Sequence, residues 1–181
     1  MRIKLMKNFN LLISTSRFNE TSAKAELWFT LLICGDNYPI ISTLKFPGLI
    51  SALTNINSKT VIRKIQKVLE KDPQFFQYIL KIVPIDFVCE SNNKVITRLV
   101  INHFKPFLKD SDTFKIDLKR RKNENIERVN LIECIAKEIN NKVNLKNPDK
   151  IIRIEVLNNF SGISFLEKDE IIRVKKDSLK I

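Results

Sequence analysis

The segment that most constrains the fold is residues 113–122, with the sequence Thr-Phe-Lys-Ile-Asp-Leu-Lys-Arg-Arg-Lys. Its apolar residues alternate with charged ones, and side chains alternate between the two faces of an extended chain. The pattern therefore predicts a half-buried strand at residues 114–118. Burying unpaired cations is costly, so the cations that follow are expected at a strand end that faces water or a polyanion. These cations are Lys119, Arg120, Arg121 and Lys122.

The charge of the whole chain indicates the same kind of partner. The 181 residues contain 32 lysines and arginines against 20 acids, a net charge of +12 with a pI near 9.7. Between Lys94 and Lys122, nine cations oppose only three carboxylates, which gives +6, half of the net charge. Clustering of this kind favours nucleic acid or another anionic surface, whereas dispersed cations would indicate solvated lysines alone.

The first half of the chain predicts the order strand, helix, strand, strand, helix, strand. Apolar periodicity and turn residues place these elements at 10–16, Glu20–Ile33, 38–46, 49–54, a helix that Ser58 caps and Asp72-Pro73 ends, and a fourth strand. Two segments, 78–83 and 85–88, compete for that fourth strand. The order is that of the ferredoxin-like β-α-β-β-α-β fold, so we assign residues 1–90 to a ferredoxin-like domain of an α+β protein.

The second half predicts a small α/β layer, which we assign to residues 91–181. Its expected elements are a helix at 92–108, the strand at 114–118, a helix at 126–143 and strands at 151–157 and 163–166, followed by an apolar run at 170–174. The strand at 151–157 is expected to be covered on both faces apart from Arg153 and Glu155. For Asp86 and Glu155, which apolar residues flank, we expect burial with a lysine or arginine partner.

No catalytic site, cofactor or metal is predicted. The three glycines (Gly35, Gly48 and Gly162) are isolated, so the chain lacks a glycine-rich loop for a dinucleotide, a nucleotide triphosphate or acetyl-coenzyme A. His103 is the only histidine, and no nucleophile signature accompanies it. The three cysteines (Cys34, Cys89 and Cys134) lack ligand spacing and are expected to pack as small hydrophobic residues.

Nothing in the sequence indicates a membrane protein. There is no apolar stretch of about 18 residues, and the basic N-terminus lacks the apolar region of a signal peptide. We therefore expect a cytoplasmic protein with no membrane partner.

Several short motifs in the second half occur in a fixed order. They are Thr113-Phe114-Lys115-Ile116 followed by Lys119-Arg120-Arg121, then Asn147-Pro148-Asp149, Ile154-Glu155-Val156 and Gly162-Ile163-Ser164. In this order they resemble a THUMP domain, the RNA-binding module of several tRNA-modifying enzymes. The first half resembles the ferredoxin-like domain that precedes THUMP, through Leu12-Ile13-Ser14-Thr15-Ser16-Arg17, Glu20, Ala25-Glu26-Leu27 and Pro84-Ile85-Asp86.

Taken over nearly the whole chain, the resemblance is to stand-alone THUMP proteins that assist tRNA cytidine acetylation. It implies a non-catalytic adaptor that binds tRNA while a separate acetyltransferase forms N4-acetylcytidine. The alternatives are an RNA-binding subunit for methylation, thiolation or pseudouridylation, a protein-interaction scaffold with a basic face, and a small enzyme with an unrecognised site.

The residues expected to bind RNA phosphates are basic residues in and around the strand at 114–118. They are Lys115, Lys119, Arg120, Arg121 and Lys122, flanked by Arg98, Lys105 and Arg128. For Lys115 the alternative is a solvent-facing strand residue, and for Arg128 it is an ion pair with Glu124 on the helix.

Overall fold

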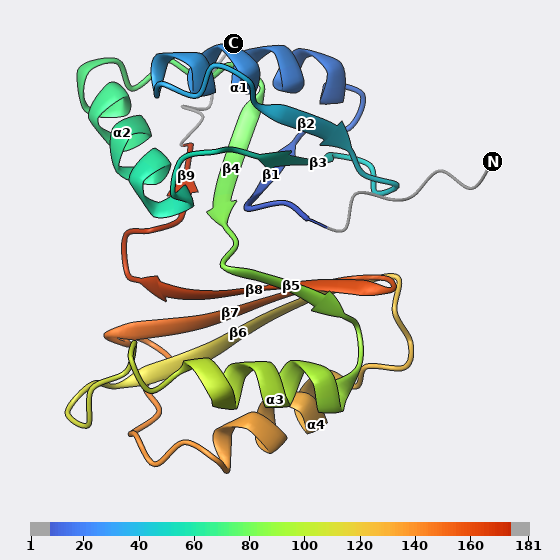
Figure 1. Ribbon diagram of the computed structural model, residues 1–181, viewed down its shortest axis with the longest axis vertical. Helices are drawn as coiled ribbons and strands as arrows, with labels where there is room; N and C mark the ends of the chain where they lie inside the picture. The colour runs from blue at the N-terminus through green and yellow to red at the C-terminus, as the bar shows by residue number, and fades with distance from the viewer. Residues whose placement is uncertain (1–7, 175–181) are drawn as a thin grey trace, which may run out of the picture. The chain divides into compact units, whose positions relative to one another are not determined.

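The structure is a computed structural model that describes residues 8–174, and these form two compact units. The first unit contains residues 8–84 and 170–174, and the second contains residues 85–169. The chain thus leaves the first unit after Pro84 and returns to it at Glu170 (Figure 1). The expected boundary lay between residues 90 and 91. The strand pairing described below instead assigns residues 87–90 to the second unit and residues 172–173 to the first.

The first unit is a five-stranded antiparallel sheet with two helices packed on one face (Figure 1). Its sheet order is β2-β3-β1-β4-β9. The elements are β1 (Leu11–Thr15), α1 (Glu20–Ile33), β2 (Ile40–Thr43), β3 (Leu49–Leu53), α2 (Ser58–Lys71), β4 (Ile79–Pro84) and β9 (Ile172–Arg173). The predicted β-α-β-β-α-β order of a ferredoxin-like unit is confirmed, and β9 adds a strand beside β4.

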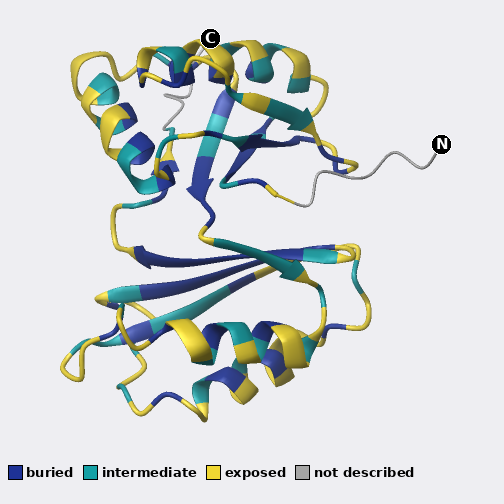
Figure 2. Ribbon diagram, viewed as in Figure 1, coloured by how far each residue is buried: buried dark blue, intermediate teal, exposed yellow. Residues whose placement is uncertain are grey.

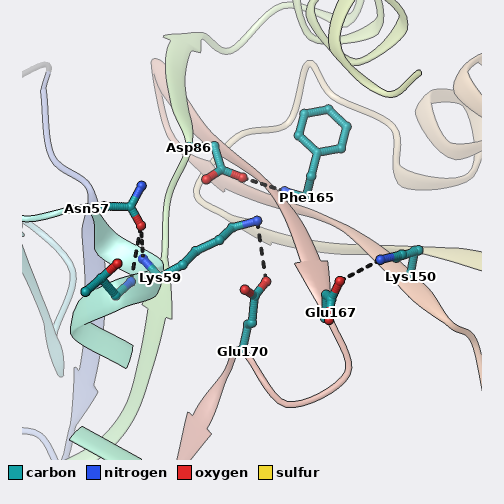
Figure 3. Close-up of polar contacts among 8 residues, drawn as sticks. Asn57, Lys59, Asp86, Lys150, Phe165, Glu167 and Glu170 are labelled. Atoms are coloured by element: carbon teal, nitrogen blue, oxygen red, sulfur yellow. Dashed lines mark hydrogen bonds and ion pairs between the residues drawn. The ribbon is translucent and has the colours of Figure 1, made fainter. Parts of the chain in front are cut away.

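Local interactions explain where the elements of this unit begin and turn. Asn57, not the expected Ser58, caps α2, since its side-chain oxygen accepts from the amides of Lys59 and Thr60 at 3.1 and 3.2 Å (Figure 3). The β2–β3 hairpin turns at Gly48, whose φ of +76° suits glycine and where a Cβ would lie 2.6 Å from the carbonyl oxygen of Thr15.

Both segments that competed for the fourth strand are strands, and they belong to different units. Residues Ile79–Pro84 form β4, which pairs antiparallel with β1. Residues Phe87–Glu90 form β5, which pairs antiparallel with β8 in the second unit. The chain returns to the first unit at Glu170, where Lys59 Nζ lies 3.4 Å from Glu170 Oε2 (Figure 3).

The second unit is a four-stranded sheet of order β5-β8-β7-β6, with two helices on one face (Figure 1). Its remaining elements are α3 (Asn93–His103), β6 (Phe114–Arg121), α4 (Arg128–Ala136), β7 (Lys150–Leu157) and β8 (Phe160–Glu167). Strands β6 and β7 are parallel, and the other pairs are antiparallel. The expected helix, strand, helix, strand, strand order is therefore present, preceded by β5.

The helices of this unit are shorter than predicted. Helix α3 begins after Asn92, whose side chain caps it, and ends at His103, ahead of Pro106. Helix α4 spans nine residues instead of residues 126–143. Beyond α4 the chain makes tertiary contacts instead of helical ones. The side-chain amide of Asn141 donates to two carbonyl oxygens of the loop that precedes β6, that of Lys109 at 2.7 Å and that of Asp112 at 3.0 Å.

The buried side of α4 also differs from the predicted stripe. The predicted inward residue Val129 is 58% exposed, whereas Leu131 and Ile135 are fully buried. Glu127 caps the helix by accepting from the amides of Val129 and Asn130, so Ile126, the first residue of the predicted stripe, lies before the helix. Val95 on α3 was likewise expected inside and is 38% exposed.

Strand β7 is buried along nearly its whole length, and Arg153, which was excepted from the expected covering of this strand, is buried with it. Arg153 and Glu155 are each only 2% exposed. The guanidinium of Arg153 binds Glu155, with Nε 2.9 Å from Oε1, and also binds the Asp117 carboxylate on the neighbouring strand β6. The expected cationic partner for Glu155 is thus confirmed. Asp86 differs, because it is exposed and its Oδ2 accepts from the amide of Phe165 at 2.7 Å (Figure 3).

Candidate nucleic-acid interface

The cationic run stands at the end of β6, which is an edge strand of the second sheet. Strand β6 extends to Arg121, three residues beyond the predicted end, and Lys119–Lys122 are exposed. Side chains alternate along the strand, so Arg121 lies on the face of Lys119, and Arg120 lies on the face that carries the helices. The four consecutive cations therefore point in more than one direction from the end of the strand.

The side chain of Arg120 makes a hydrogen bond to the loop that follows β6. Its Nη1 donates to the carbonyl oxygen of Ile126 at 2.6 Å, which fixes the loop between β6 and α4 against the strand end. Neither Arg120 nor Arg121 makes an ion pair with a carboxylate of residues 8–174. The positive charge of the strand end is therefore not neutralised by carboxylates in that part of the chain.

An open pocket of about 560 Å³ lies at this end of the second unit. Three segments form it: the start of α3, the loop after β6 and the turn between β7 and β8. Its lining residues are Glu90, Ser91, Asn92, Asn93, Lys94, Asn123, Asn125, Ile126 and Asn159. The asparagine side chains supply both hydrogen-bond donors and acceptors, and Lys94 and the N-terminus of α3 supply positive charge.

Hydrogen bonds tie the three segments of the pocket together. Asn123 Nδ2 donates to the carbonyl oxygen of Asn158 at 2.6 Å, and the Asn158 amide donates to the carbonyl oxygen of Arg121 at 3.1 Å. The Ser91 amide donates to the carbonyl oxygen of Asn159 at 3.0 Å. The pocket is thus a braced surface, which suits recognition of a folded RNA by shape.

The structure brings some of the predicted site residues together and separates others. Arg98 lies one helical turn from Lys94, and Arg128 is the first residue of α4, directly after the loop. Lys105 lies beyond the other end of α3, about 16 Å along the helix from Lys94. Lys115 lies near the start of β6, about 20 Å along the strand from Arg121. The alternative for Arg128, an ion pair with Glu124, is absent from the described residues.

The sequence interpretation missed Lys94 and the asparagines of the pocket. They were visible in the sequence as caps and turn residues, at Ser91-Asn92-Asn93, Asn123 and Asn158-Asn159. Only the fold places these three turns at one end of the sheet. The signal available in advance was the number of asparagines at the ends of predicted elements.

The motif residues Thr113 and Asp149 have a structural role. The Thr113 hydroxyl and amide both donate to Asp149 Oδ2, at 2.7 and 2.8 Å, and the Asp149 amide returns a bond of 3.0 Å to the Thr113 carbonyl oxygen. These bonds hold the starts of the parallel strands β6 and β7 together. The two bonds that the Asp149 carboxylate accepts also lower its pKa, with the Thr113 hydroxyl as the main cause.

The histidine and the three cysteines differ in their surroundings. His103 is exposed, with its ring 4.3 Å from that of Phe87 and its Nδ1 2.8 Å from the Leu99 carbonyl oxygen. Cys34 is buried, and partial burial raises the pKa of the Cys89 thiol to about 11. Cys134 is exposed, contrary to the prediction for all three cysteines. Across residues 8–174, no three His, Cys, Asp or Glu residues are grouped to hold a metal ion.

None of the helices within the described part of the chain has both the length and the apolar composition needed to cross a membrane.

Residues 90–166 match the family model of the THUMP domain. This range runs from the last residue of β5 to one residue before the end of β8. The chain therefore contains a THUMP domain, an RNA-binding module, and the resemblance inferred from the motifs is confirmed.

Two relatives share part of their sequence with this chain. The THUMP domain-containing protein 1 homolog of Drosophila melanogaster is 33% identical over 109 residues, which cover 57% of this chain and 33% of that protein. The tRNA acetyltransferase TAN1 of Saccharomyces cerevisiae is 26% identical over 113 residues, which cover 55% of this chain and 39% of that protein. The matched part therefore spans between a third and two fifths of either relative's length.

The fold is also found among solved structures. The crystal structure of PH1313 from Pyrococcus horikoshii superposes with a TM-score of 0.65 over 92% of this chain and 55% of that chain, at 19% sequence identity. At this identity the likeness establishes a shared fold.

Proposed function

We propose that this protein is a non-catalytic adaptor that binds tRNA and presents it to a separate enzyme, the acetyltransferase that forms N4-acetylcytidine. The RNA-binding half of this proposal rests on the THUMP domain together with the exposed cations at the end of β6. The acetylation half is supported by the similarity to the yeast tRNA acetyltransferase TAN1.

The observation that carries the RNA-binding surface is the position of the cations around the braced pocket. Lys94, Arg121 and Lys122 lie at the pocket or within a few residues of its lining. Cations on a rigid surface bind phosphates, and arginine binds two phosphate oxygens at once. The asparagine-rich pocket offers hydrogen bonds to sugar hydroxyls and to the edges of unpaired bases.

The first experiment measures tRNA affinity over a range of salt concentrations. We expect Arg121→Ala with Lys122→Ala to weaken binding and to reduce the slope of log affinity against log salt by about 0.7–0.9 for each phosphate that the variant no longer neutralises. Fluorescence anisotropy with a labelled tRNA is a suitable assay. A slope equal to that of the unchanged protein would refute the placement of the RNA surface.

Lys105→Ala is a matched control because it removes one exposed cation at the far end of α3. It should change the slope less than Lys94→Ala, which removes a cation from the pocket. Equal effects at the two positions would mean that RNA is bound by net charge alone.

The second experiment tests the division of labour between the two proteins. Purified acetyltransferase should form more N4-acetylcytidine on tRNA when this protein is added, and this protein by itself should form none. Modification of tRNA by this protein without a second protein would favour the alternative of a small enzyme.

A further inference from the structure

Helix α1 is apolar on the side that faces away from its sheet as well as on the side that packs against it. Ala23, Leu27 and Leu31 are buried on the inner side. On the outer side, Trp28 is 50% exposed, Phe29 is 55% exposed and Ile33 is 50% exposed, with Leu32 half-buried between them. At 3.6 residues per turn these outer residues occupy one arc of roughly 140°. We call Trp28, Phe29, Leu32 and Ile33 the outer α1 patch.

Helix α2 shows what an ordinary helix of this unit looks like. It packs on the same sheet and has the same length of 14 residues. Its exposed residues, which Figure 2 colours yellow, include Arg63, Lys67 and Lys71. A polar outer side is normal for a helix at a protein surface, whereas a helix that is apolar all round is normally covered. From Leu27 to Ile33, the sequence of α1 is therefore that of a helix with something packed on both sides.

The surroundings of the outer α1 patch indicate what covers it. Between Leu27 and Leu44 the only charged residue is Asp36. Asp36 is fully buried, and its carboxylate accepts from the amides of Tyr38 at 3.1 Å and Asn55 at 3.2 Å. The patch residues themselves carry no charge, and the cations beside them are Lys24, one turn before Trp28, and Lys64, whose Nζ donates to the Cys34 carbonyl oxygen at 2.6 Å. Burial of this apolar surface, rather than contact with phosphates, would supply the binding energy, so the occupant is a protein, and the two cations at the edge of the patch favour acidic surroundings on that protein.

Area and charge narrow the choice of protein. The outer α1 patch exposes roughly 400 Å² of apolar surface, given that a fully exposed aromatic side chain presents about 150–250 Å². A standard interface buries about 800 Å² on each partner, and aromatic residues lie at its energetic centre. A second copy of this chain would also carry +12 and would be repelled. A different protein with an uncharged apolar contact surface and acidic surroundings fits better.

We propose that the outer α1 patch is the docking surface for the modification enzyme. This inference rests on the proposed function, which requires such an enzyme. It assigns the two tasks of an adaptor to different units of the chain: the first unit binds the enzyme through α1, and the second unit binds tRNA through the end of β6.

The test uses the full chain, a labelled tRNA and the purified tRNA N4-cytidine acetyltransferase of the same organism. The main variant is Trp28→Gln with Phe29→Gln, and Ile33→Gln is a milder second variant in case the first one does not fold. Val129→Gln is the matched control, since Val129 is 58% exposed on a helix of the other unit. Enzyme affinity is measured by calorimetry, tRNA affinity by anisotropy and folding by thermal melting.

We expect the outer α1 variants to raise the Kd for the enzyme at least about tenfold, as removal of a central aromatic side chain does, while tRNA affinity stays unchanged. Val129→Gln should leave both affinities unchanged. Unaltered enzyme binding by the folded variants would overturn the docking surface and leave the proposed function standing. Loss of tRNA binding in the same variants would identify the patch as an RNA surface instead.

Two further outcomes would also overturn the inference. A chain that is dimeric alone, and that the outer α1 variants make monomeric, would identify a second copy as the occupant. If the unchanged protein binds tRNA but does not bind the acetyltransferase, the acetylation role fails and the docking surface falls with it.

Discussion

The buried guanidinium of Arg153 offers the sharpest test of how the second unit is held together. Arg153 lies on β7 with its side chain 2% exposed, and it binds two carboxylates, Glu155 on the same strand and Asp117 on β6. The Glu155 side chain is only 3% exposed, and that of Asp117 is 22% exposed. Replacing Arg153 by methionine keeps much of the volume and leaves the Glu155 carboxylate buried without its cation.

The expected loss follows from this burial. Removing one partner of a buried ion pair costs about 3–5 kcal/mol, because the remaining charge stays desolvated. The partly exposed Asp117 adds less than about 1 kcal/mol. A total near 4 kcal/mol is a large share of the roughly 5–15 kcal/mol that stabilises a typical protein.

The assay is urea unfolding followed by circular dichroism, together with hydrogen exchange of the β7 amides to locate the effect. The double variant Arg153→Met with Glu155→Met removes both buried charges, so it should be more stable than Arg153→Met alone. If Arg153→Met costs less than about 1 kcal/mol, or if the double variant is the less stable of the two, the reasoning about the buried charge is wrong.

Three further outcomes follow from other contacts. Gly48→Ala should destabilise the first unit by at least about 1–3 kcal/mol in urea unfolding, because a φ of +76° and a Cβ 2.6 Å from the Thr15 carbonyl oxygen both oppose a side chain; unchanged stability would contradict that turn geometry. Thr113→Val should raise the pKa of Asp149 in an NMR titration. Because the folded pKa of Asp149 lies below its ordinary value of 3.8, the stabilisation from this contact is present above that value and is lost as pH falls through the folded pKa, so the variant and the unchanged protein should converge in stability at more acid pH. Ile172→Ala, at a residue 4% exposed in β9, should cost about 2–5 kcal/mol and act on the first unit, and an effect confined to the second unit would contradict the pairing of β9 with β4.

The elements that the sequence predicted well are those whose pattern is local. The helix at Glu20–Ile33 was predicted with its observed bounds, because its apolar residues recur at helical spacing and Gly35-Asp36 follows it. The strand at 114–118 was predicted from strict alternation, and the structure extends it through the cations to Arg121. The motif order identified the THUMP domain, which residues 90–166 confirm.

The candidate site was only partly predictable. The cations of β6 were found because they are consecutive, but Lys94 and the asparagines of the pocket come from three separate turns. Each turn is unremarkable by itself, since asparagine is a common cap and turn residue. Conversely, Lys105 and Lys115 lie close to the run in sequence and far from it along their elements.

By itself, the sequence determined the order of most strands and helices, where the positive charge is concentrated and that the second half contains a THUMP domain. Each of these depends on neighbouring residues, whose periodicity and order are fixed by the chain. The tertiary structure alone decided that β9 pairs with β4, that α4 stops at Ala136, and that α1 shows an apolar side to solvent. These three features depend on which distant segments of the chain pack together. A residue is buried when such a segment covers it, and the local sequence pattern does not specify which segment that is.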